Sequence, residues 1–182
     1  REMFHDDTDL IWIPPSPNMP TLETALVYAG MALIEGTELS EGRGTTKPFE
    51  QVGGPTLDGG RMAARLNDRH VPGAIFRPVT FTPLASKWAG QPCEGVQTHV
   101  TDRRIYPSVR AGLEVLTAVR DLFPGALTWR SRREGFPFDR LAGTERVRRE
   151  IDAGTGAEEI TESFEPDLRV FRERREPYLL YR

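Results

Sequence analysis

Cysteine and histidine are scarce in this sequence of 182 residues, which has one cysteine, Cys93, and three histidines. A single thiol excludes an internal disulfide framework and a cysteine-rich zinc site. His5 and His70 have no companions at the spacings of known zinc ligands, so we expect no metal and no cofactor. No stretch approaches the roughly 20 apolar residues that a membrane helix needs, so no membrane span is expected.

An excess of charge of one sign is also missing, because 24 basic residues face 27 acidic ones and the net charge is −3. Proteins that bind phosphate backbones need a basic footprint, so we expect no nucleic-acid partner. The arginine-rich stretches 130–133, 146–149 and 172–175 have acidic residues within or beside them, which indicates solvated helix faces. Glycine-rich phosphate loops, the Gly-x-Ser-x-Gly nucleophile motif and the His-Glu-x-x-His zinc motif are absent.

Proline and glycine, in contrast, are plentiful, with fifteen and seventeen residues, and they predict long irregular connections. Four prolines between positions 12 and 20 predict a stiff extended arm. Thr21 is a predicted cap for a helix over residues 22–29, which Gly30 ends. The apolar run 31–34 is predicted as a buried strand, and it leads into a polar loop over residues 35–46.

The spacing of apolar residues predicts the secondary structure of most of the remaining chain. Helical spacing predicts helices over residues 61–70, 107–122, 144–153, 157–164 and 165–176, the last with Leu168 and Phe171 facing inward. Alternation predicts strands over residues 74–82 and 95–101. These elements predict one α+β domain over residues 1–182, a small mixed β-sheet covered by helices with long proline- and glycine-rich loops. A doubly wound α/β sheet is the alternative.

The densest group of polar residues is the loop 35–46, which contains Glu35, Glu38, Glu41 and Arg43. Glycines on both sides of Arg43 allow a positive φ, so the backbone can approach a ligand and present the guanidinium to a carboxylate. Paired carboxylates are what glycosidic-bond cleavage requires, and Glu35, at the end of a predicted strand, is the best-placed candidate. The alternative is a solvated surface turn in which Glu41 and Arg43 pair with each other.

His99 lies within the predicted strand 95–101, where alternation places it on one face with Gln97 and Thr101. This polar stripe is either a wet outer face or the floor of a cleft. Aromatic residues that could stack on sugars are also present, although a core role is more common for most of them; they are Trp12, Trp88, Trp129, Tyr28 and Phe81.

Strings spread over essentially the whole chain resemble the NamZ-type exo-β-N-acetylmuramidases. They are Pro14-Pro-Ser-Pro-Asn-Met-Pro-Thr-Leu-Glu-Thr24, Ile34-Glu-Gly-Thr-Glu-Leu-Ser-Glu-Gly-Arg-Gly-Thr-Thr46, Pro48-Phe-Glu50, Phe81-Thr-Pro83, Ser86-Lys87, Gly95-Val-Gln97, His99-Val-Thr-Asp102, Phe138-Asp-Arg-Leu-Ala-Gly-Thr144 and Pro177-Tyr-Leu-Leu-Tyr181.

The resemblance implies a glycoside hydrolase that releases terminal N-acetylmuramic acid from peptidoglycan fragments. Such enzymes look like a two-part design, with an N-terminal Rossmann-like domain, a C-terminal α+β domain and the active cleft between them. This sequence is similar to the C-terminal part only, and its start, without an initiator Met, reads like internal sequence. We therefore expect that the N-terminal domain is absent, that this chain alone is inactive, and that the longer protein works outside the cytoplasm.

The resemblance places the main catalytic acid in the absent domain, so the catalytic residues of this chain are unknown, with Glu35 and Glu41 as lesser candidates. We hypothesise that Arg43 holds the lactyl carboxylate of N-acetylmuramic acid, in a contact worth ~1.5–3 kcal/mol, and that Glu41 orients the guanidinium. The further candidates for substrate binding are Asn18, Ser40, Thr45 and His99. The alternatives are a non-catalytic sugar-binding module, and a structural domain whose glycine-rich loop packs against a partner.

Overall fold

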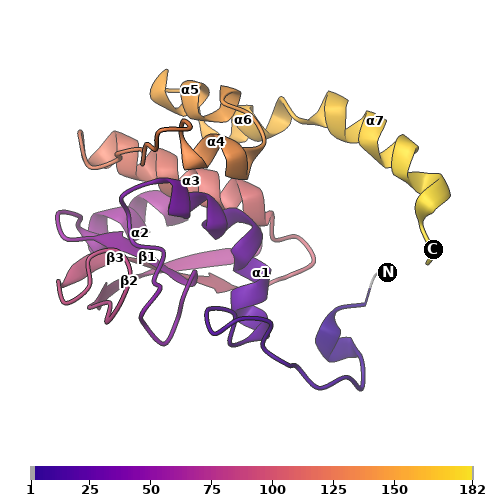
Figure 1. Ribbon diagram of the computed structural model, residues 1–182, viewed down its shortest axis with the longest axis horizontal. Helices are drawn as coiled ribbons and strands as arrows, with labels where there is room; N and C mark the ends of the chain where they lie inside the picture. Colours follow the sequence, from indigo (N-terminus) through magenta and orange to yellow (C-terminus); the bar gives the residue numbers. More distant parts are fainter. Residues whose placement is uncertain (1–2, 182) are drawn as a thin grey trace.

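The computed structural model describes residues 3–181, in which helices cover one face of a three-stranded sheet (Figure 1). The strands are β1 (Gln51–Gly54), β2 (Ala74–Phe81) and β3 (Cys93–Val100), in the order β1-β3-β2. The main helices of the body are α1 (Leu22–Met31), α2 (Gly59–Asp68) and α3 (Ser108–Leu122). The shorter helices α4 (Pro137–Ala142), α5 (Arg146–Asp152) and α6 (Ala157–Glu162) lie beyond α3, on the side away from the sheet (Figure 1). The α+β class is therefore confirmed.

The first helix starts where the sequence predicts it but continues further. The Thr21 side chain accepts a hydrogen bond from the backbone N–H of Thr24, which confirms the cap. The helix passes through Gly30 and leads into a 3₁₀ helix, η2 (Ala32–Gly36), so the strand predicted over residues 31–34 is wrong. Four apolar residues can be buried by a helix as well as by a strand, and this run is too short for its periodicity to decide. Glu35 consequently lies in η2 and not at a strand end.

The sheet is antiparallel in both described pairings. The strands predicted over residues 74–82 and 95–101 are present as β2 and β3, which pair along their whole lengths. Pro78 lies in β2, an edge strand, where its missing N–H costs the ladder least. The third strand, β1, is not among the predicted strands, because its sequence Gln-Val-Gly-Gly has no alternation to detect. A Cβ at Gly95 would lie 1.9 Å from the carbonyl oxygen of Val52, so this close strand pairing requires glycine.

The hydrophobic core lies between the sheet, α1, α2 and α3. The predicted helices over 61–70 and 107–122 are confirmed as α2 and α3 within two residues at their ends. Their apolar stripes are buried as the periodicity predicts, with Met62 and Leu66 from α2 and Leu113, Leu116 and Val119 from α3. Burial of these apolar stripes fixes how α2 and α3 pack, and so it also fixes where the loops joined to these helices lie.

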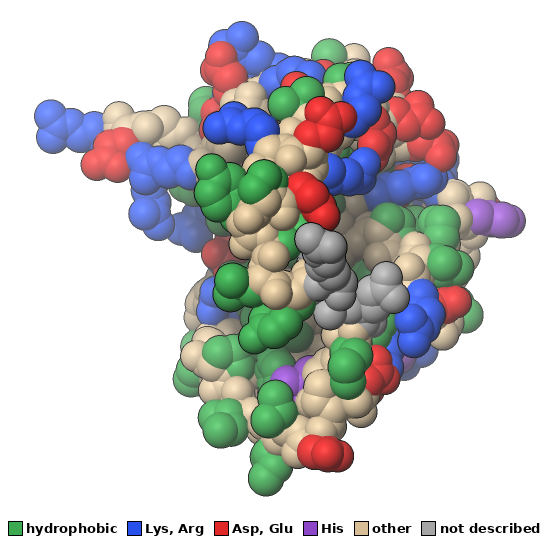
Figure 2. Space-filling model, turned by 90° about the vertical axis from the view of Figure 1, so that its right-hand side faces the viewer, with side chains coloured by type: hydrophobic (Ala, Val, Ile, Leu, Met, Phe, Trp, Pro, Cys, Tyr) green, Lys and Arg blue, Asp and Glu red, His purple; other side chains and the backbone are tan. Residues whose placement is uncertain are grey.

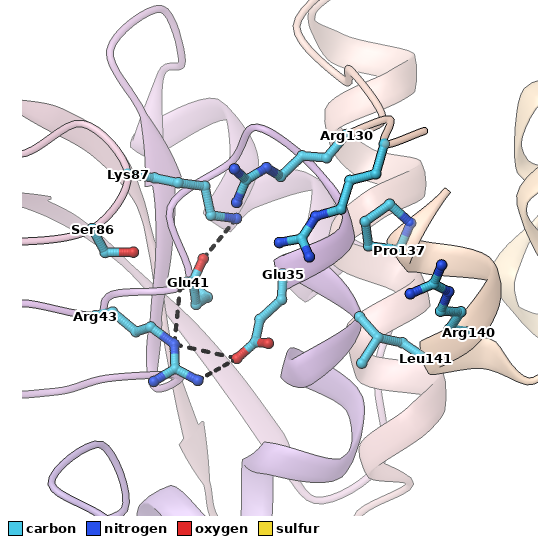
Figure 3. Close-up of a pocket in the computed structure, with 10 residues that line it drawn as sticks. Glu35, Glu41, Arg43, Ser86, Lys87, Arg130, Pro137, Arg140 and Leu141 are labelled. Carbon is cyan, nitrogen blue, oxygen red and sulfur yellow. Dashed lines mark hydrogen bonds and ion pairs between the residues drawn. The ribbon is translucent and has the colours of Figure 1, made fainter. Parts of the chain in front are cut away.

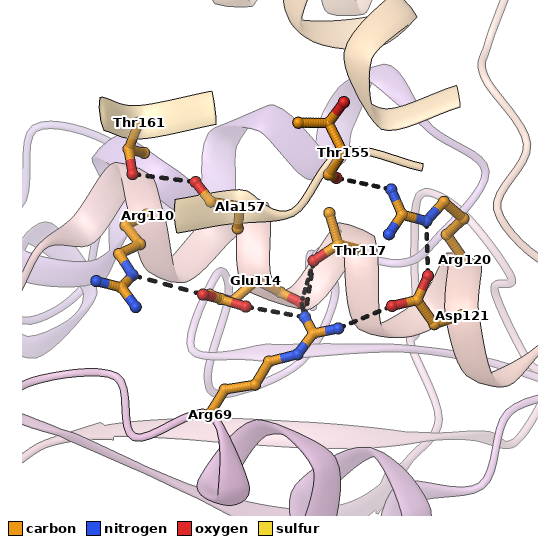
Figure 4. A network of polar contacts seen from close by, with 9 residues as sticks. All are labelled: Arg69, Arg110, Glu114, Thr117, Arg120, Asp121, Thr155, Ala157 and Thr161. Atoms are coloured by element: carbon orange, nitrogen blue, oxygen red, sulfur yellow. Dashed lines mark hydrogen bonds and ion pairs between the residues drawn. The ribbon is translucent and has the colours of Figure 1, made fainter. Parts of the chain in front are cut away.

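A polar network ties the helices together (Figure 4). Arg69, at the end of α2, donates to the Glu114 carboxylate at 2.8 Å and to the Thr117 hydroxyl at 2.7 Å, both on α3. Its other terminal nitrogen lies 2.9 Å from an oxygen of Asp121. Arg120 on α3 donates to backbone carbonyls at the end of α5 and in the α5–α6 connection. The network therefore joins α2, α3 and the outer helices at the side of the core.

The C-terminal part contains both confirmed and wrong predictions. The short helices predicted over 144–153 and 157–164 are present as α5 and α6. The charged helix predicted over 165–176 is present as α7 (Glu165–Arg175), followed by a 3₁₀ turn, η3 (Glu176–Tyr178). Leu168 and Phe171 do not face inward as predicted, because every residue of α7 is exposed and the helix projects from the body (Figure 1). An apolar stripe on a helix shows which face tends to be buried, but it does not show which part of the protein, or which partner, buries it.

Candidate functional site

The loop around Arg43 has the backbone that its glycines predict. Gly42 and Gly44 have φ values of +76° and +79°, a region that glycine enters without a steric penalty. A Cβ at Gly44 would lie 2.5 Å from the backbone nitrogen of Ala85, so this loop packs directly on the loop that follows β2. The backbone N–H of Leu84 donates to the carbonyl of Gly44 at 2.9 Å and joins the two loops. Arg43 is thus presented from a fixed turn.

The loop that follows β2 directs the Lys87 side chain towards Arg43 and Glu41. Ser86 and Trp88, on either side of it, have φ values of +70° and +59°, which cost about 1–3 kcal/mol each for residues other than glycine. The Lys87 ammonium donates to the carbonyls of Ile34 and Thr37 at 3.1 and 2.8 Å. Its side chain is 8% exposed. Burial lowers the pKa of Lys87, and the nearby Glu41 carboxylate opposes that shift.

Four charged side chains form a continuous ion-pair chain, the Arg43 cluster, made of Glu35, Arg43, Glu41 and Lys87 (Figure 3). Arg43 Nη2 lies 2.5 Å from Glu35 Oε1, and Arg43 Nε lies 3.4 Å from Glu41 Oε1. The second oxygen of Glu41 lies 2.7 Å from Lys87 Nζ. The guanidinium carbon of Arg43 also lies 5.0 Å from the centre of the Phe49 ring. The pairing of Glu41 with Arg43, expected as the alternative, is present, and Glu35 makes the shorter contact.

The Arg43 cluster forms one side of a cavity of about 330 Å³, called here the basic pocket. The other side comes from the α3–α4 connection and from α4 (Figure 3). Its lining residues are Glu35, Glu41, Arg43, Ser86, Lys87, Arg130, Arg132, Pro137, Arg140 and Leu141. Five of them are basic and two are acidic, so the cavity has an excess of positive charge in a chain whose net charge is negative. Such a cavity concentrates anions of small size.

The structure brings only part of the predicted site together. Glu35, Glu41 and Arg43 line the basic pocket. The Ser40 and Thr45 hydroxyls bond to the backbone of Gly42, and so they stabilise the turn that carries Arg43. Two more candidates lie elsewhere, since Asn18 belongs to the N-terminal arm, and His99 is an exposed residue of β3.

The other basic residues of the pocket were missed as site residues. Arg130 and Arg132 were predicted on a solvated helix face, but they lie in the irregular connection between α3 and α4. Glycine and proline at positions 135 and 137 were a usable signal that this stretch is a loop. Lys87 and Arg140 had no local signal, because no spacing in the sequence relates them to Arg43.

Among the described residues, no helix has the length and apolar character that crossing a membrane demands. Within residues 3–181, no group of three or more His, Cys, Asp or Glu side chains is placed to hold a metal ion.

Comparison with known protein families finds a match over residues 26–181 to the family described as exo-β-N-acetylmuramidase NamZ, C-terminal. The chain is also 45% identical, over 181 residues, to the peptidoglycan β-N-acetylmuramidase NamZ of Bacillus subtilis (strain 168). That match covers all of this chain and 43% of the relative.

Two solved structures, both of DUF1343 family proteins from Bacteroides fragilis NCTC 9343, have a similar fold. The first is 26% identical with a TM-score of 0.88, and the match covers all of this chain and 48% of that one. The second is 27% identical with a TM-score of 0.65, and the match covers 93% of this chain and 44% of that one. The chain thus spans less than half the length of these relatives.

Proposed function

The chain belongs to the family of NamZ C-terminal domains, as the resemblance predicted, and from this membership we propose that it is the C-terminal part of a longer glycoside hydrolase. The proposed reaction is release of terminal N-acetylmuramic acid from peptidoglycan fragments. In this proposal residues 1–182 form one domain that supplies one wall of the substrate cleft. A Rossmann-like N-terminal domain supplies the other wall and the main catalytic acid.

The structural observation that carries the proposal is the basic pocket. N-acetylmuramic acid differs from N-acetylglucosamine by a lactyl group with a carboxylate. Five basic side chains from separate segments of the chain converge on one small cavity, although the whole chain is acidic. In the proposal, Arg43 receives the carboxylate, and Arg132 and Arg140 face it from the opposite side.

Glu35 and Glu41 have a supporting role in the proposal and not a catalytic one. Glu35 accepts two hydrogen bonds from Arg43, and Glu41 pairs with Arg43 and Lys87. Cations thus contact Glu35 Oε1 and both oxygens of Glu41. We therefore assign these carboxylates to the positioning of Arg43 and Lys87.

The same observation supports a second candidate function, a sugar-binding module without chemistry of its own. A pocket whose carboxylates are both ion-paired can recognise an acidic saccharide without cleaving it. The two functions differ in what the rest of the longer protein contributes. Mixing this chain with the remaining part of the Bacillus subtilis relative and measuring release of N-acetylmuramic acid from a chromogenic glycoside separates them.

The exposed apolar residues indicate which surface of this chain contacts the remaining domain of the longer protein in this proposal. The N-terminal arm and α7 leave the body on the same side (Figure 1), and apolar side chains are spread over that face (Figure 2). Those of α7 and the tail are Leu168, Val170, Phe171, Tyr178, Leu180 and Tyr181. The occupant in this proposal is the remaining domain, because the relatives are more than twice as long as this chain.

The test of the anion site is the substitution Arg43→Lys. A lysine keeps the charge but loses the planar fork, so we expect affinity for N-acetylmuramic acid to fall by about tenfold, while the weaker binding of N-acetylglucosamine stays unchanged. Isothermal titration with both sugars measures this. The matched control is Arg65→Lys, on the exposed side of α2 and outside the pocket. Equal affinity of the variant and the unchanged chain for N-acetylmuramic acid would remove Arg43 from this role.

A further inference from the structure

A second cavity lies next to the basic pocket and has a different chemistry. It has a volume of about 260 Å³ and is called here the neutral hollow. Its lining residues are Glu38, Leu39, Gly54, Pro55, Thr56, Leu57, Trp88, Gly125, Ala126 and Thr128. Among these described residues only Glu38 is charged, and its carboxylate lies 3.5 Å from Arg130 Nε, a side chain of the basic pocket.

The two cavities share a wall formed by residues 37–38, 87–88 and 128–130. Residues 37 and 129 form an antiparallel bridge, in which the N–H of Glu38 donates to the carbonyl of Thr128 at 2.9 Å. Neighbouring residues in the segments that form this wall line different cavities. Lys87 lines the basic pocket and Trp88 the neutral hollow, and Arg130 lines the basic pocket and Thr128 the neutral hollow. The two cavities therefore adjoin at this wall.

Trp88 is held as a fixed aromatic surface at the neutral hollow. Its backbone has a φ of +59°, which is strained for a bulky residue. Its indole N–H donates to the carbonyl of Glu38 at 2.6 Å, so the ring orientation is set by the wall itself. The residue nevertheless remains 36% exposed. Backbone strain of this kind persists only where the surrounding structure holds it, and it is often found at ligand-binding sites.

We propose that the neutral hollow binds an uncharged pyranose ring, stacked on Trp88, of a saccharide whose acidic unit occupies the basic pocket. The inference rests on the proposed function and extends it from one sugar to two. The C–H groups of a pyranose face carry partial positive charge and match the negative face of the indole ring. Thr56 and Thr128 supply hydroxyls for the ring substituents. An anionic occupant would meet no cation there, because the charged lining residue among those described is Glu38, and its partner Arg130 lines the basic pocket.

The first measurement is nuclear magnetic resonance of the unchanged chain, observed at the indole N–H groups of its three tryptophans. We titrate N-acetylmuramic acid, N-acetylglucosamine and the disaccharide that joins them. The disaccharide is expected to shift the Trp88 signal and to leave the Trp12 signal, on the N-terminal arm, in place. A Trp88 signal that stays fixed at saturating disaccharide would overturn the inference, and this result does not depend on any variant folding.

The second measurement compares Trp88→Leu with Trp88→Phe. Leucine removes the aromatic face and phenylalanine keeps it, so disaccharide affinity should fall about three- to tenfold in the leucine variant and less in the phenylalanine variant. Affinity for N-acetylmuramic acid alone should not change in either variant. Trp12→Leu is the control and should bind both ligands as the unchanged chain does.

The outcomes separate the inference from the proposed function. Failure of N-acetylmuramic acid to bind the unchanged chain overturns the proposed function and the inference together. Binding of N-acetylmuramic acid with no gain for the disaccharide overturns the inference alone. Equal disaccharide affinity in Trp88→Leu and the unchanged chain does the same.

Discussion

At the scale of single residues, burial displaces two pKa values in ways that act oppositely on stability. Burial lowers the pKa of Lys87, so between its folded value and 10.5 the unfolded chain binds more protons, and stability rises with pH there. Burial raises the pKa of Tyr106 above its usual value of 10. Above pH 10 the unfolded chain therefore loses a proton that the folded chain keeps, and stability falls as pH rises.

The substitution Tyr106→Phe tests the second effect. The Tyr106 hydroxyl is buried without a hydrogen bond of normal geometry among the described residues, and a weak contact with Ser108 lowers its pKa by less than burial raises it. Its removal should leave stability at pH 7 unchanged or raised by about 1 kcal/mol. The variant should also lose less stability than the unchanged chain between pH 9 and about 11, a range that brackets the ordinary tyrosine pKa. Urea unfolding across this range measures both effects, and parallel pH curves for the two proteins would contradict the assignment.

The substitution Lys87→Met tests the Arg43 cluster. It removes one partner of a buried ion pair and leaves the Glu41 carboxylate, which is almost fully buried, with only its longer contact to Arg43. We expect a loss of about 3 kcal/mol in the free energy of unfolding. The double variant Lys87→Met with Glu41→Gln should recover part of that loss, because the buried charge is gone. A double variant as unstable as the sum of the two single ones would show that the pair is not coupled.

At the scale of elements, the crossing of α1 and α3 depends on two glycines. Gly30 and Gly112 face each other so closely that a Cβ at Gly112 would lie 2.3 Å from the carbonyl oxygen of Gly30. The Ser108 hydroxyl reinforces the crossing, since it accepts from the N–H of Gly30 and donates to the carbonyl of Val27. Gly30 was predicted as a helix stop, but the structure gives it a packing role. Sequence alone does not separate the two roles, because both need the absence of a side chain.

Gly112→Ala should therefore destabilise the protein, although alanine is the better helix former. The added methyl group meets backbone atoms that cannot move aside, and we expect a cost of about 2–3 kcal/mol. Gly156→Ala is the control, since a Cβ there meets no described atom within 4 Å, and it should cost about 1 kcal/mol or less. Chemical denaturation measures both variants. A Gly112→Ala variant as stable as the control would mean that the helices lie further apart.

At the scale of the whole molecule, the body is stabilised by a buried core, whereas the projecting helix α7 is not. The body has a contiguous core, whereas α7 exposes every residue, including Phe171 at 57%. A helix of eleven residues without a packed face is marginal in water. We therefore expect α7 to keep this form only when another surface covers it.

Removal of residues 168–182 should leave the body intact. We expect the melting temperature to change by about 2 °C or less, because these residues contribute little to the core. Ile160→Ala is the contrasting variant, since Ile160 is fully buried in α6 and its truncation should cost about 2–5 kcal/mol. Calorimetry compares the three proteins. A large drop in the melting temperature of the shortened chain would show that α7 packs on the body.

What the sequence by itself determined are the features that depend on neighbouring residues. The periods of α2, α3, β2 and β3, the Thr21 cap and the positive φ values beside Arg43 are local consequences of side-chain spacing and of glycine. Family membership was also readable, because long strings of the family recur along the chain. The short apolar run before Glu35 was misassigned because a few residues do not define a period.

Only the tertiary structure decided the composition of the basic pocket and of the neutral hollow. Arg43, Lys87 and Arg132 come from separate loops, and the packing of α1 and α2 on the sheet, and of α3 on these two helices, brings the loops together. The net charge of a cavity depends on residues from several loops that are far apart in the sequence. No short stretch of sequence therefore indicates that charge. Burial likewise set the pKa values of Lys87 and Tyr106, because desolvation depends on every segment that covers a side chain.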